Sequence, residues 1–399
     1  MPSPLEVSHV FHLSGTGGRH VWGGAERHLR ILLPALAARG VDVEAIVLVT
    51  NPSAQVDEGL AELERAGVRV TRLERRSRGS LARRLPAVVA QHLRLAALLR
   101  RRRGRVVHLH LDMVGAPLAA GLARCPRTVM TLHLDEQSWR ARRWRLWLRL
   151  VDRVVARYVA ISGRVGAYWR EVARVAPERI DVVPYGIAEP GPSCARRAQL
   201  GVPEEGFVAG FVGRLVEQKD PLVLVEALGG VAGVRLVLIG DGPLRGALER
   251  RVAEAGHENV VFAGAREDAA GLLPLLDVLC LPSRFEGLGL VLLEAMARGV
   301  PCVGSRAGAI PEVLGQGRCG VLVEAGDAAG LRAAVLALRD DPMRRARLAD
   351  AGRAQVRARF TVARMAERTC AVYAACTGSL ADGAYATRPG GTAYAGRRS

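Results

Sequence analysis

Residues 277–305 read DVLCLPSRFEGLGLVLLEAMARGVPCVGS, and this stretch decides the fold. Its first residues, DVLCLPS, form an apolar run of the kind found in a buried strand. The segment LVLLEAMA is apolar on nearly every side, which is typical of a buried helix. A second apolar run, PCVGS, follows the helix. A strand, a helix and another strand in this order predict a βαβ unit with parallel strands.

The same alternation extends outward over most of the chain. In the first half, apolar runs separated by helix-length segments occupy residues 7–15, 41–50, 68–74, 105–111, 127–133, 157–162 and 180–186. In the second half they occupy 207–214, 234–242, 259–264, 277–283, 301–307 and 319–326. Two successive sets predict an α/β protein with two doubly wound Rossmann-like domains that face each other across a cleft.

The expected domain boundaries follow from the composition and the hydrophobic periodicity of the sequence. We predict an amino-terminal domain over 1–187, a linker over 188–205 that lacks any period, and a carboxyl-terminal domain over 206–355. A helix over 356–377 is expected to pack back on the amino-terminal domain. The residues from 378 to 399 contain almost no large apolar side chains and are predicted to be a disordered tail.

Composition excludes several classes of protein. A chain of 399 residues with 49% hydrophobic and 24% charged residues is globular and long enough for two cores. Seven scattered cysteines suggest neither a disulfide framework nor a zinc site. The first residues, MPSPLEVSHVFHLSG, lack the features of a signal peptide, and no 18-residue uncharged apolar segment follows. We therefore expect a cytoplasmic enzyme.

The net charge of +18 is concentrated in the first half, where residues 1–185 carry +15 and residues 186–399 carry +3. Such a field favours nucleic acid, an anionic lipid surface or a phosphorylated acceptor. Residues 139–153 interleave three tryptophans with six arginines, and a second basic stretch covers 83–105. The first segment predicts either a helix in an anionic lipid interface or an ordinary helix with solvated arginines.

Ligands of open parallel sheets bind beyond the carboxyl ends of the strands, and glycines gather there in this sequence. The first such place is GTGGRHVWGGAERHL at 15–29, where Gly23 and Gly24 open a helix whose amides suit an anion. The alternative is a tight turn without a ligand. The segment does not have the GxGxxG spacing of a dinucleotide site, which argues against a nicotinamide-dependent dehydrogenase.

The turn at 286–290 carries the strongest functional signal. Glu286 lies in the turn, and Glu294 lies in the apolar helix that follows, where an unpaired charge is costly. The partner of Glu294 is either Arg298, four residues on, or the two hydroxyls of a ribose. The amides from Gly287 to Leu290 are expected to face a diphosphate.

A cationic segment lies about seventy residues upstream, in GFVGRLVEQKDP at 210–221. Lys219 is the single lysine among 57 basic residues, and Arg214 stands five residues before it. An ammonium is a natural partner for a phosphate oxygen. Together with Glu286 and Glu294, these cations predict a sugar-nucleotide site.

These motifs, with VRLVLIGDGPLR, GGAERH, VAISGRV and VVPYGI, resemble the family 4 glycosyltransferases, which are retaining enzymes of GT-B architecture. The resemblance is close over about 150 residues and covers most of the first 355 loosely. It implies that Arg214 and Lys219 bind the donor diphosphate, that Glu286 meets the transferred sugar, and that Glu294 holds the ribose. It also implies that His133 faces the donor sugar. The further donor-binding positions are Gly23, Gly24, Gly213, Gly287, Leu288, Gly289 and Leu290.

Two residues depart from the family pattern. Leu288 stands where the family more often has Phe, and Tyr185 replaces the Asn that is common in the family's turn at this place. His108 and His110 in VVHLHLD are also candidate site residues, although a histidine in a buried strand is more often structural than catalytic.

The expected reaction is the metal-independent transfer of a sugar, with retained configuration, from a nucleotide-sugar donor to a hydroxyl. Because no Asp-x-Asp pair occurs, no metal or other cofactor is expected, and Arg214, Lys219 and helix amides neutralise the leaving diphosphate. The expected donor is UDP- or GDP-linked. The expected acceptor is lipid-linked or anionic, in envelope, polysaccharide, glycolipid or natural-product assembly, with peripheral contact to the membrane. The alternatives are a nucleotide-sugar epimerase of the same fold and a nucleic-acid-binding protein.

Overall fold

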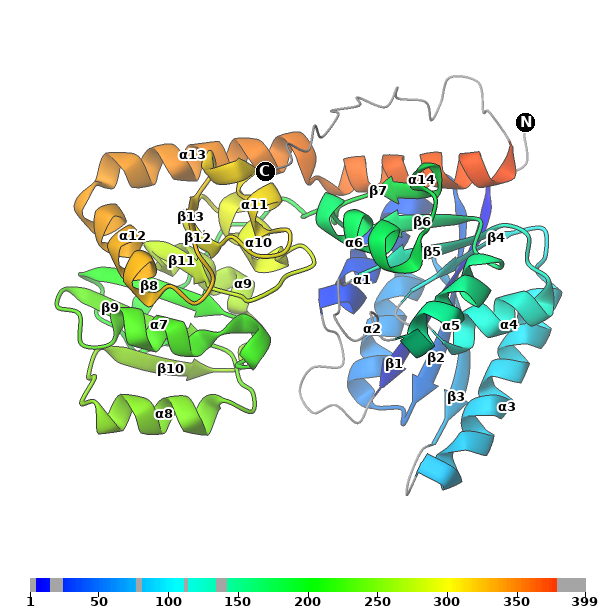
Figure 1. The fold of residues 1–399 in the computed structure, drawn as a ribbon, viewed down its shortest axis with the longest axis horizontal. Helices are drawn as coiled ribbons and strands as arrows, with labels where there is room; N and C mark the ends of the chain where they lie inside the picture. Colours follow the sequence, from blue (N-terminus) through cyan, green and yellow to red (C-terminus); the bar gives the residue numbers. More distant parts are fainter. Residues whose placement is uncertain (1–4, 15–23, 77–80, 111–113, 134–141, 379–399) are drawn as a thin grey trace.

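The computed structural model describes residues 5–14, 24–76, 81–110, 114–133 and 142–378, and these residues form two α/β domains side by side (Figure 1). Gly23, Trp139 and Arg140 lie outside the described residues, as does the predicted tail from 379 onward. All seven cysteines are free.

The amino-terminal domain is built on a sheet with seven strands among the described residues, in the order β3-β2-β1-β4-β5-β6-β7. The strands are β1 (Glu6–Ser14), β2 (Asp42–Thr50), β3 (Arg69–Arg75), β4 (Val106–Leu109), β5 (Thr128–Leu132), β6 (Arg157–Ala160) and β7 (Ile180–Val182). Every neighbouring pair is parallel. The strand order reverses between β1 and β4, which is where ligands of such sheets bind.

The carboxyl-terminal domain repeats this plan with the order β10-β9-β8-β11-β12-β13. Its strands are β8 (Phe207–Val212), β9 (Val234–Ile239), β10 (Val260–Gly264), β11 (Val278–Leu281), β12 (Cys302–Ser305) and β13 (Val321–Val323). All pairs are parallel, and the order reverses between β8 and β11. The predicted fold class, two doubly wound Rossmann-like domains, is confirmed.

Helices connect the strands and cover both faces of each sheet (Figure 1). The amino-terminal helices are α1 (Gly24–Ala37), α2 (Ala54–Arg65), α3 (Leu81–Arg100), α4 (Gly115–Ala123), α5 (Arg142–Asp152) and α6 (Gly163–Ala173). The later helices are α7 (Pro221–Leu228), α8 (Arg245–Glu254), α9 (Ala269–Leu272), α10 (Leu290–Ala297), α11 (Ile310–Val313), α12 (Ala328–Asp340), α13 (Pro342–Arg359) and α14 (Val362–Thr377). Because both faces are covered, the central strands β2, β4, β5, β8 and β11 are buried almost throughout.

The last helix, α14, returns to the amino-terminal domain. It packs against α1, and its Met365, Cys370 and Tyr373 join the apolar core formed by β1, β2 and α1. The predicted start of this helix at residue 356 is wrong, because α13 continues to Arg359. The break comes at Phe360, and Thr361 then caps α14 by accepting a hydrogen bond from the backbone N–H of Arg364.

The two connections between the domains lie next to each other. The backbone N–H of Ile187 donates to the carbonyl oxygen of Phe360 at 2.7 Å, so the outgoing and returning chains are hydrogen-bonded. At Gly186 an added Cβ would lie 2.6 Å from the Cα of Val362. A glycine is therefore required where the two chain segments cross.

Candidate functional site

The turn between β11 and α10 is held by its own backbone and by a neighbouring loop. Gly289 has a φ of +84°, a left-handed conformation that favours glycine and lets the chain enter α10. The carbonyl oxygen of Glu286 accepts from the backbone N–H of Ala309 at 2.9 Å. At Gly308 an added Cβ would lie 2.1 Å from that same oxygen. Two loops at the carboxyl edge of the sheet thus fix the backbone of Glu286.

The side chain of Glu286 forms an ion pair with Lys219. Both groups are largely buried, with exposed side-chain fractions of 11% for Glu286 and 18% for Lys219. The Ser283 hydroxyl also donates to Glu286 Oε2, at 3.4 Å. The structure therefore brings together a predicted phosphate-binding cation and a predicted sugar-binding carboxylate that stand 67 residues apart in the sequence.

Arg214 is exposed at the carboxyl end of β8, next to Gly213. Among the described residues it has no carboxylate partner, in contrast to Lys219. Gly213 contacts the chain after β9 closely, since a Cβ at Gly240 would lie 1.9 Å from the Gly213 carbonyl oxygen. Arg214 is thus held on a tightly packed backbone with its guanidinium in solvent.

Glu294 lies half-buried in α10, and burial raises the pKa of its carboxyl group. The charges of Arg27 and Arg298 oppose this shift. Arg298 donates to the carbonyl oxygen of Gly191 at 3.2 Å, and among the described residues no hydrogen bond or ion pair joins it to Glu294. Arg27 lowers the pKa of Glu294 more than Arg298 does, and it lies in α1 of the amino-terminal domain.

Gly287 brings the two domains into contact. An added Cβ at this position would lie 2.4 Å from the carbonyl oxygen of His133 and 3.3 Å from Cδ1 of Ile161. His133 follows β5 in the amino-terminal domain. His133 therefore lies next to the turn that carries Glu286, and its role toward the donor sugar stays a prediction.

His133 is held by Tyr185, to which its Nδ1 is hydrogen-bonded. The ring of His28 stacks on Tyr185 with 3.9 Å between ring centroids. Burial lowers the pKa of His133 to about 4, so this imidazole is neutral at neutral pH. The sequence identified Tyr185 as a departure from the family pattern, but it gave no signal that His28, Tyr185 and His133 meet.

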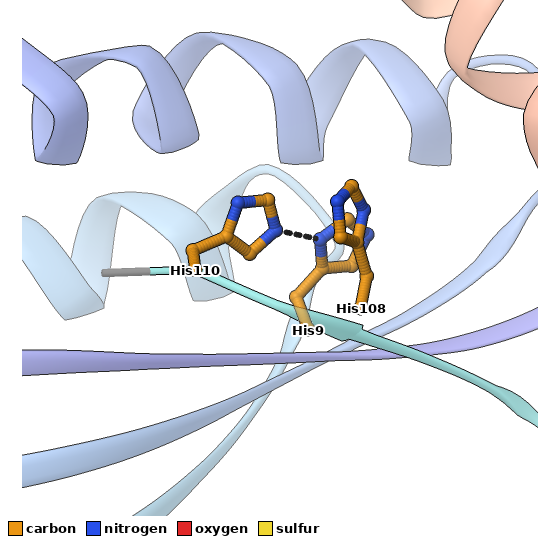
Figure 2. Close-up of side chains that lie close together, drawn as sticks. All are labelled: His9, His108 and His110. Atoms are coloured by element: carbon orange, nitrogen blue, oxygen red, sulfur yellow. Dashed lines mark hydrogen bonds between the residues drawn. The ribbon is translucent and has the colours of Figure 1, made fainter. Parts of the chain in front are cut away.

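Three more histidines of the amino-terminal domain, His9, His108 and His110, lie close together (Figure 2). Nitrogen atoms of His9, His108 and His110 all lie within 4.8 Å of one another. His9 Nδ1 is hydrogen-bonded to His110 Nε2 at 3.0 Å, and His108 is hydrogen-bonded to Thr131 and to Tyr373, each at 2.7 Å.

His108 and His110, the two further candidate site residues, differ in their hydrogen bonds. Both nitrogens of His108 are satisfied within the core, as is typical of a structural histidine. Nδ1 of His110 is buried and has no hydrogen-bond partner among the described residues. The predicted absence of a metal and of other cofactors stays a prediction.

A second contact between the domains lies near their connections. The carboxylate of Glu312 in α11 accepts from the backbone N–H of Gly163 at 2.9 Å, at the first residue of α6. An added Cβ at Gly163 would lie 3.2 Å from this carboxylate oxygen. A negative charge at a helix amino terminus is stabilising, so Glu312 joins the two domains favourably.

The predicted tryptophan-rich helix corresponds to α5. Its Leu148 and Val151 are buried, and Trp147 packs against the core. Leu146 and Leu150 of the same helix are exposed. One face of α5 therefore packs on the core of the domain, and another face carries exposed leucines. In the described part of the chain, none of the helices combines the length and apolar character that a bilayer crossing requires.

Comparisons with known proteins identify the fold and the family. The profile described as Glycosyltransferase Family 4 matches residues 22–189, and the profile described as Glycosyl transferases group 1 matches residues 206–341. The structure also resembles that of Anabaena Alr3699/HepE in complex with UDP and glucose, with a TM-score of 0.76 and 23% identity over 93% of this chain and all of that one. These likenesses define a glycosyltransferase of GT-B fold.

Curated relatives identify the family. A mannosyltransferase of Mycolicibacterium hassiacum, named MMP alpha-(1->4)-mannosyltransferase, is 31% identical over 70% of this chain and 73% of its own length. The Rhizobium meliloti lipopolysaccharide core glycosyltransferase LpsE is 29% identical over 83% of this chain and 89% of its own. The match to LpsD of the same organism is 38% identical but spans 51% of that protein. The chain belongs to the family 4 glycosyltransferases. These relatives give no support to the epimerase alternative.

Proposed function

We propose that this glycosyltransferase moves a sugar from a UDP- or GDP-linked donor to a hydroxyl acceptor, without a metal and with retained configuration at the transferred carbon. The observation that carries the proposal is the buried pair of Lys219 and Glu286, which lies at the turn facing His133. A cation and a carboxylate side by side match a donor that presents phosphate oxygens next to sugar hydroxyls.

The roles follow from the chemistry of each side chain. The exposed guanidinium of Arg214 and the ammonium of Lys219 stabilise the negative charge that grows on the leaving diphosphate. Glu286 accepts from hydroxyls of the transferred sugar. Glu294 accepts from the ribose hydroxyls, and its elevated pKa marks a carboxylate that gains from such donors.

Retention of configuration follows if the acceptor attacks the face from which the diphosphate departs. In this arrangement a phosphate oxygen of the leaving group takes the proton of the acceptor hydroxyl as the new bond forms. No separate base is then required, and His133, which is neutral, holds the sugar through hydrogen bonds.

Donor binding is tested by thermal shift with UDP-, GDP-, ADP- and TDP-sugars, because a ligand of the native state raises the Tm. We expect one nucleotide class to give the largest shift, and Lys219→Ala and Glu294→Ala each to abolish most of it. Arg251→Ala, at an exposed cation in α8, is the matched control and keeps the shift. Unchanged shifts in both site variants would refute the assignment.

We also propose an anionic lipid surface as the partner of the amino-terminal domain, and the cytoplasmic face of the membrane as the location of the enzyme. Three helices each expose apolar side chains four residues apart: Leu85, Val89 and Leu93 in α3, Leu118 and Leu122 in α4, and Leu146 and Leu150 in α5. The surrounding domain carries a net charge of +15 over residues 1–185. Apolar side chains within a basic surface match the boundary between headgroups and acyl chains.

Vesicle flotation tests this surface. The protein is expected to float with phosphatidylglycerol vesicles at low salt and less at high salt, and not with phosphatidylcholine vesicles. The double variant Leu146→Glu and Leu150→Glu should lose flotation. Leu222→Glu, at an exposed leucine of α7 in the other domain, is the control. Equal flotation of both variants would contradict the proposal. The acceptor, a glycolipid or polysaccharide precursor, would then be met in solution.

A further inference from the structure

Asp220 follows Lys219 directly and has an unusual backbone conformation for a residue other than glycine. Its φ is +49°, a left-handed conformation in which a residue with a side chain is strained. Pro221 comes next, and a residue before a proline favours an extended backbone instead. Glycine would adopt this conformation at a lower cost, so the presence of an aspartate calls for an explanation.

The usual roles of an aspartate at such a place do not apply to Asp220. It stands at the start of α7, where an aspartate commonly accepts hydrogen bonds from the first backbone amides of the helix, but its side chain accepts none from them. Contact with solvent does not explain it either, since the side chain is only 6% exposed. A buried carboxylate needs a partner.

That partner is Arg284, whose Nε donates to Oδ2 of Asp220 at 2.9 Å. Arg284 lies in the loop after β11, two residues before Glu286, and its side chain is 65% exposed. Among the described residues, no second hydrogen bond or ion pair holds this guanidinium. The pair therefore joins the loop that carries Lys219 to the loop that carries Glu286.

Gln218, on the other side of Lys219, makes two more connections between these loops. Its carbonyl oxygen accepts from the backbone N–H of Arg284 at 2.8 Å, and its Nε2 donates to the carbonyl oxygen of Phe285 at 3.2 Å. The loops leave neighbouring strands, because β8 and β11 are paired in the sheet. Both chain neighbours of Lys219 are thus attached to the residues that precede Glu286.

The spacing of the two loops matters for a donor that contacts both. Lys219 would bind the diphosphate and Glu286 the sugar, so both contacts form together only if the loops stay at a fixed distance. Without a donor the ammonium is paired with Glu286, and it must turn toward the phosphate oxygens when the donor binds. A lysine side chain is flexible enough to turn while an anchored backbone stays in place.

We propose that Asp220 and Arg284 are positioning residues of the transfer reaction. Their ion pair holds the backbone of Lys219 at the distance from Glu286 that the donor requires, and neither residue contacts the donor itself. The inference rests on the proposed function, since it assigns the diphosphate to Lys219. The strained backbone of Asp220 is then retained because glycine has no side chain that reaches Arg284.

The test separates activity from stability with two single variants and their combination. Asp220→Gly relieves the strained backbone and leaves only an exposed arginine unpaired, so its Tm should stay close to that of the natural protein. Arg284→Ala leaves a buried carboxylate without its partner, so its Tm should fall. The double variant should regain the Tm, because neither charge then remains.

Activity should follow a different pattern from stability. The assay is hydrolytic release of the nucleoside diphosphate from the nucleotide sugar that gives the largest thermal shift. In each single variant kcat should fall about tenfold, as expected for one weakened charge-assisted contact in the transition state, while KM changes less than about twofold. The double variant should lose no more than the single variants, because all three lack the same contact.

Matched variants control for each kind of substitution. Gln316→Gly places glycine at an exposed left-handed residue of the same domain, with a φ of +58°, and should keep the natural kcat. Arg245→Ala removes another arginine that is paired through Nε, to Glu249 at 2.8 Å, and should also keep it. Asp220→Asn, whose amide oxygen still accepts from Arg284, should retain more activity than Asp220→Gly.

A second readout needs no turnover. In Asp220→Gly the backbone N–H of Arg284, which donates to Gln218, should exchange its hydrogen faster, as measured by mass spectrometry. Natural exchange and natural kcat in Asp220→Gly would overturn the proposal. So would recovery of kcat together with the Tm in the double variant, which would make the pair merely structural. A much larger loss in Arg284→Ala than in Asp220→Gly would show that Arg284 contacts the ligand, against the proposal.

These results are distinguishable from a failure of the proposed function. Binding of nucleotide sugars to Lys219→Ala is measured separately by thermal shift. If Lys219→Ala keeps the full shift, the assignment of the diphosphate fails whatever the pair does. If Lys219→Ala loses the shift and Asp220→Gly keeps the natural kcat and exchange, the positioning role alone fails.

Discussion

Replacement of Gly287 by alanine tests whether contact between the domains is required for transfer. The added Cβ would lie 2.4 Å from the carbonyl oxygen of His133, whereas ordinary van der Waals contact begins near 3.4 Å. Because this oxygen belongs to the backbone, it cannot rotate away. The turn that carries Glu286 and the segment that carries His133 must therefore move apart by about 1 Å.

A displacement of this size should lower the catalytic rate strongly but have little effect on the stability of each domain. Misplacement of reacting groups by about 1 Å lowers rates by about a hundredfold, equivalent to about 2.7 kcal/mol of transition-state stabilisation. The φ of Gly287 is not positive, so alanine fits its local backbone. Each domain should thus keep its fold while the two domains separate slightly.

The assay is release of nucleoside diphosphate from the donor, with kcat/KM compared among the natural protein, Gly287→Ala and a control. Gly271→Ala in α9 is the control, because an added Cβ there meets nothing within 4 Å. Small-angle scattering should show a larger radius of gyration for Gly287→Ala alone. Full activity of Gly287→Ala, or an equal loss in Gly271→Ala, would refute the reasoning.

Three more outcomes are expected. Tyr373→Phe removes the hydroxyl that is hydrogen-bonded to His108 at 2.7 Å, and denaturant titration should show a loss of about 1–3 kcal/mol in the free energy of unfolding. Burial and Arg105 lower the pKa of His9 to about 3, so the unfolded chain binds the extra proton below pH 6.5. Stability should then fall with pH below that value, by about 1.4 kcal/mol per pH unit from His9, as measured by titrations at pH 7.5, 6 and 5. Glu312→Ala should enlarge the radius of gyration, whereas Glu312→Gln, whose amide oxygen still accepts from Gly163, should not.

The fold could be predicted because its signal is local. Each central strand of a doubly wound sheet is buried on both faces, so it appears as a short apolar run between helix-length segments. The break at Phe360 was missed because 342–377 is helical on both sides of it, and neither glycine nor proline marks the end of α13. Thr361 is a capping residue that is also tolerated inside helices, so its role is visible from the structure alone.

The site was predictable in its charged part and not in its neutral part. Lys219 stands out as the single lysine and Glu286 as a carboxylate in a glycine-rich turn, although their direct pairing across 67 residues depends on the strand order β8-β11. Tyr185 was noted only as a departure from the family pattern, and His110 only as one of two histidines in a buried strand. His28 gave no signal, because neutral aromatic and imidazole side chains are ordinary in a core. The contacts among these side chains arise from packing, and no spacing in the sequence encodes them.

The two domains differ in the chemistry that they offer to a ligand. The carboxyl-terminal domain places Arg214, Lys219, Glu286 and Glu294 along one edge of its sheet, as a charged donor requires. The facing edge of the amino-terminal domain carries imidazoles that burial keeps neutral, although the same domain has the larger positive charge. A cationic edge there would attract a second phosphate group and compete with the acceptor for the space beside the donor sugar. Neutral imidazoles do not attract a phosphate group, so the excess of arginine can serve a separate surface.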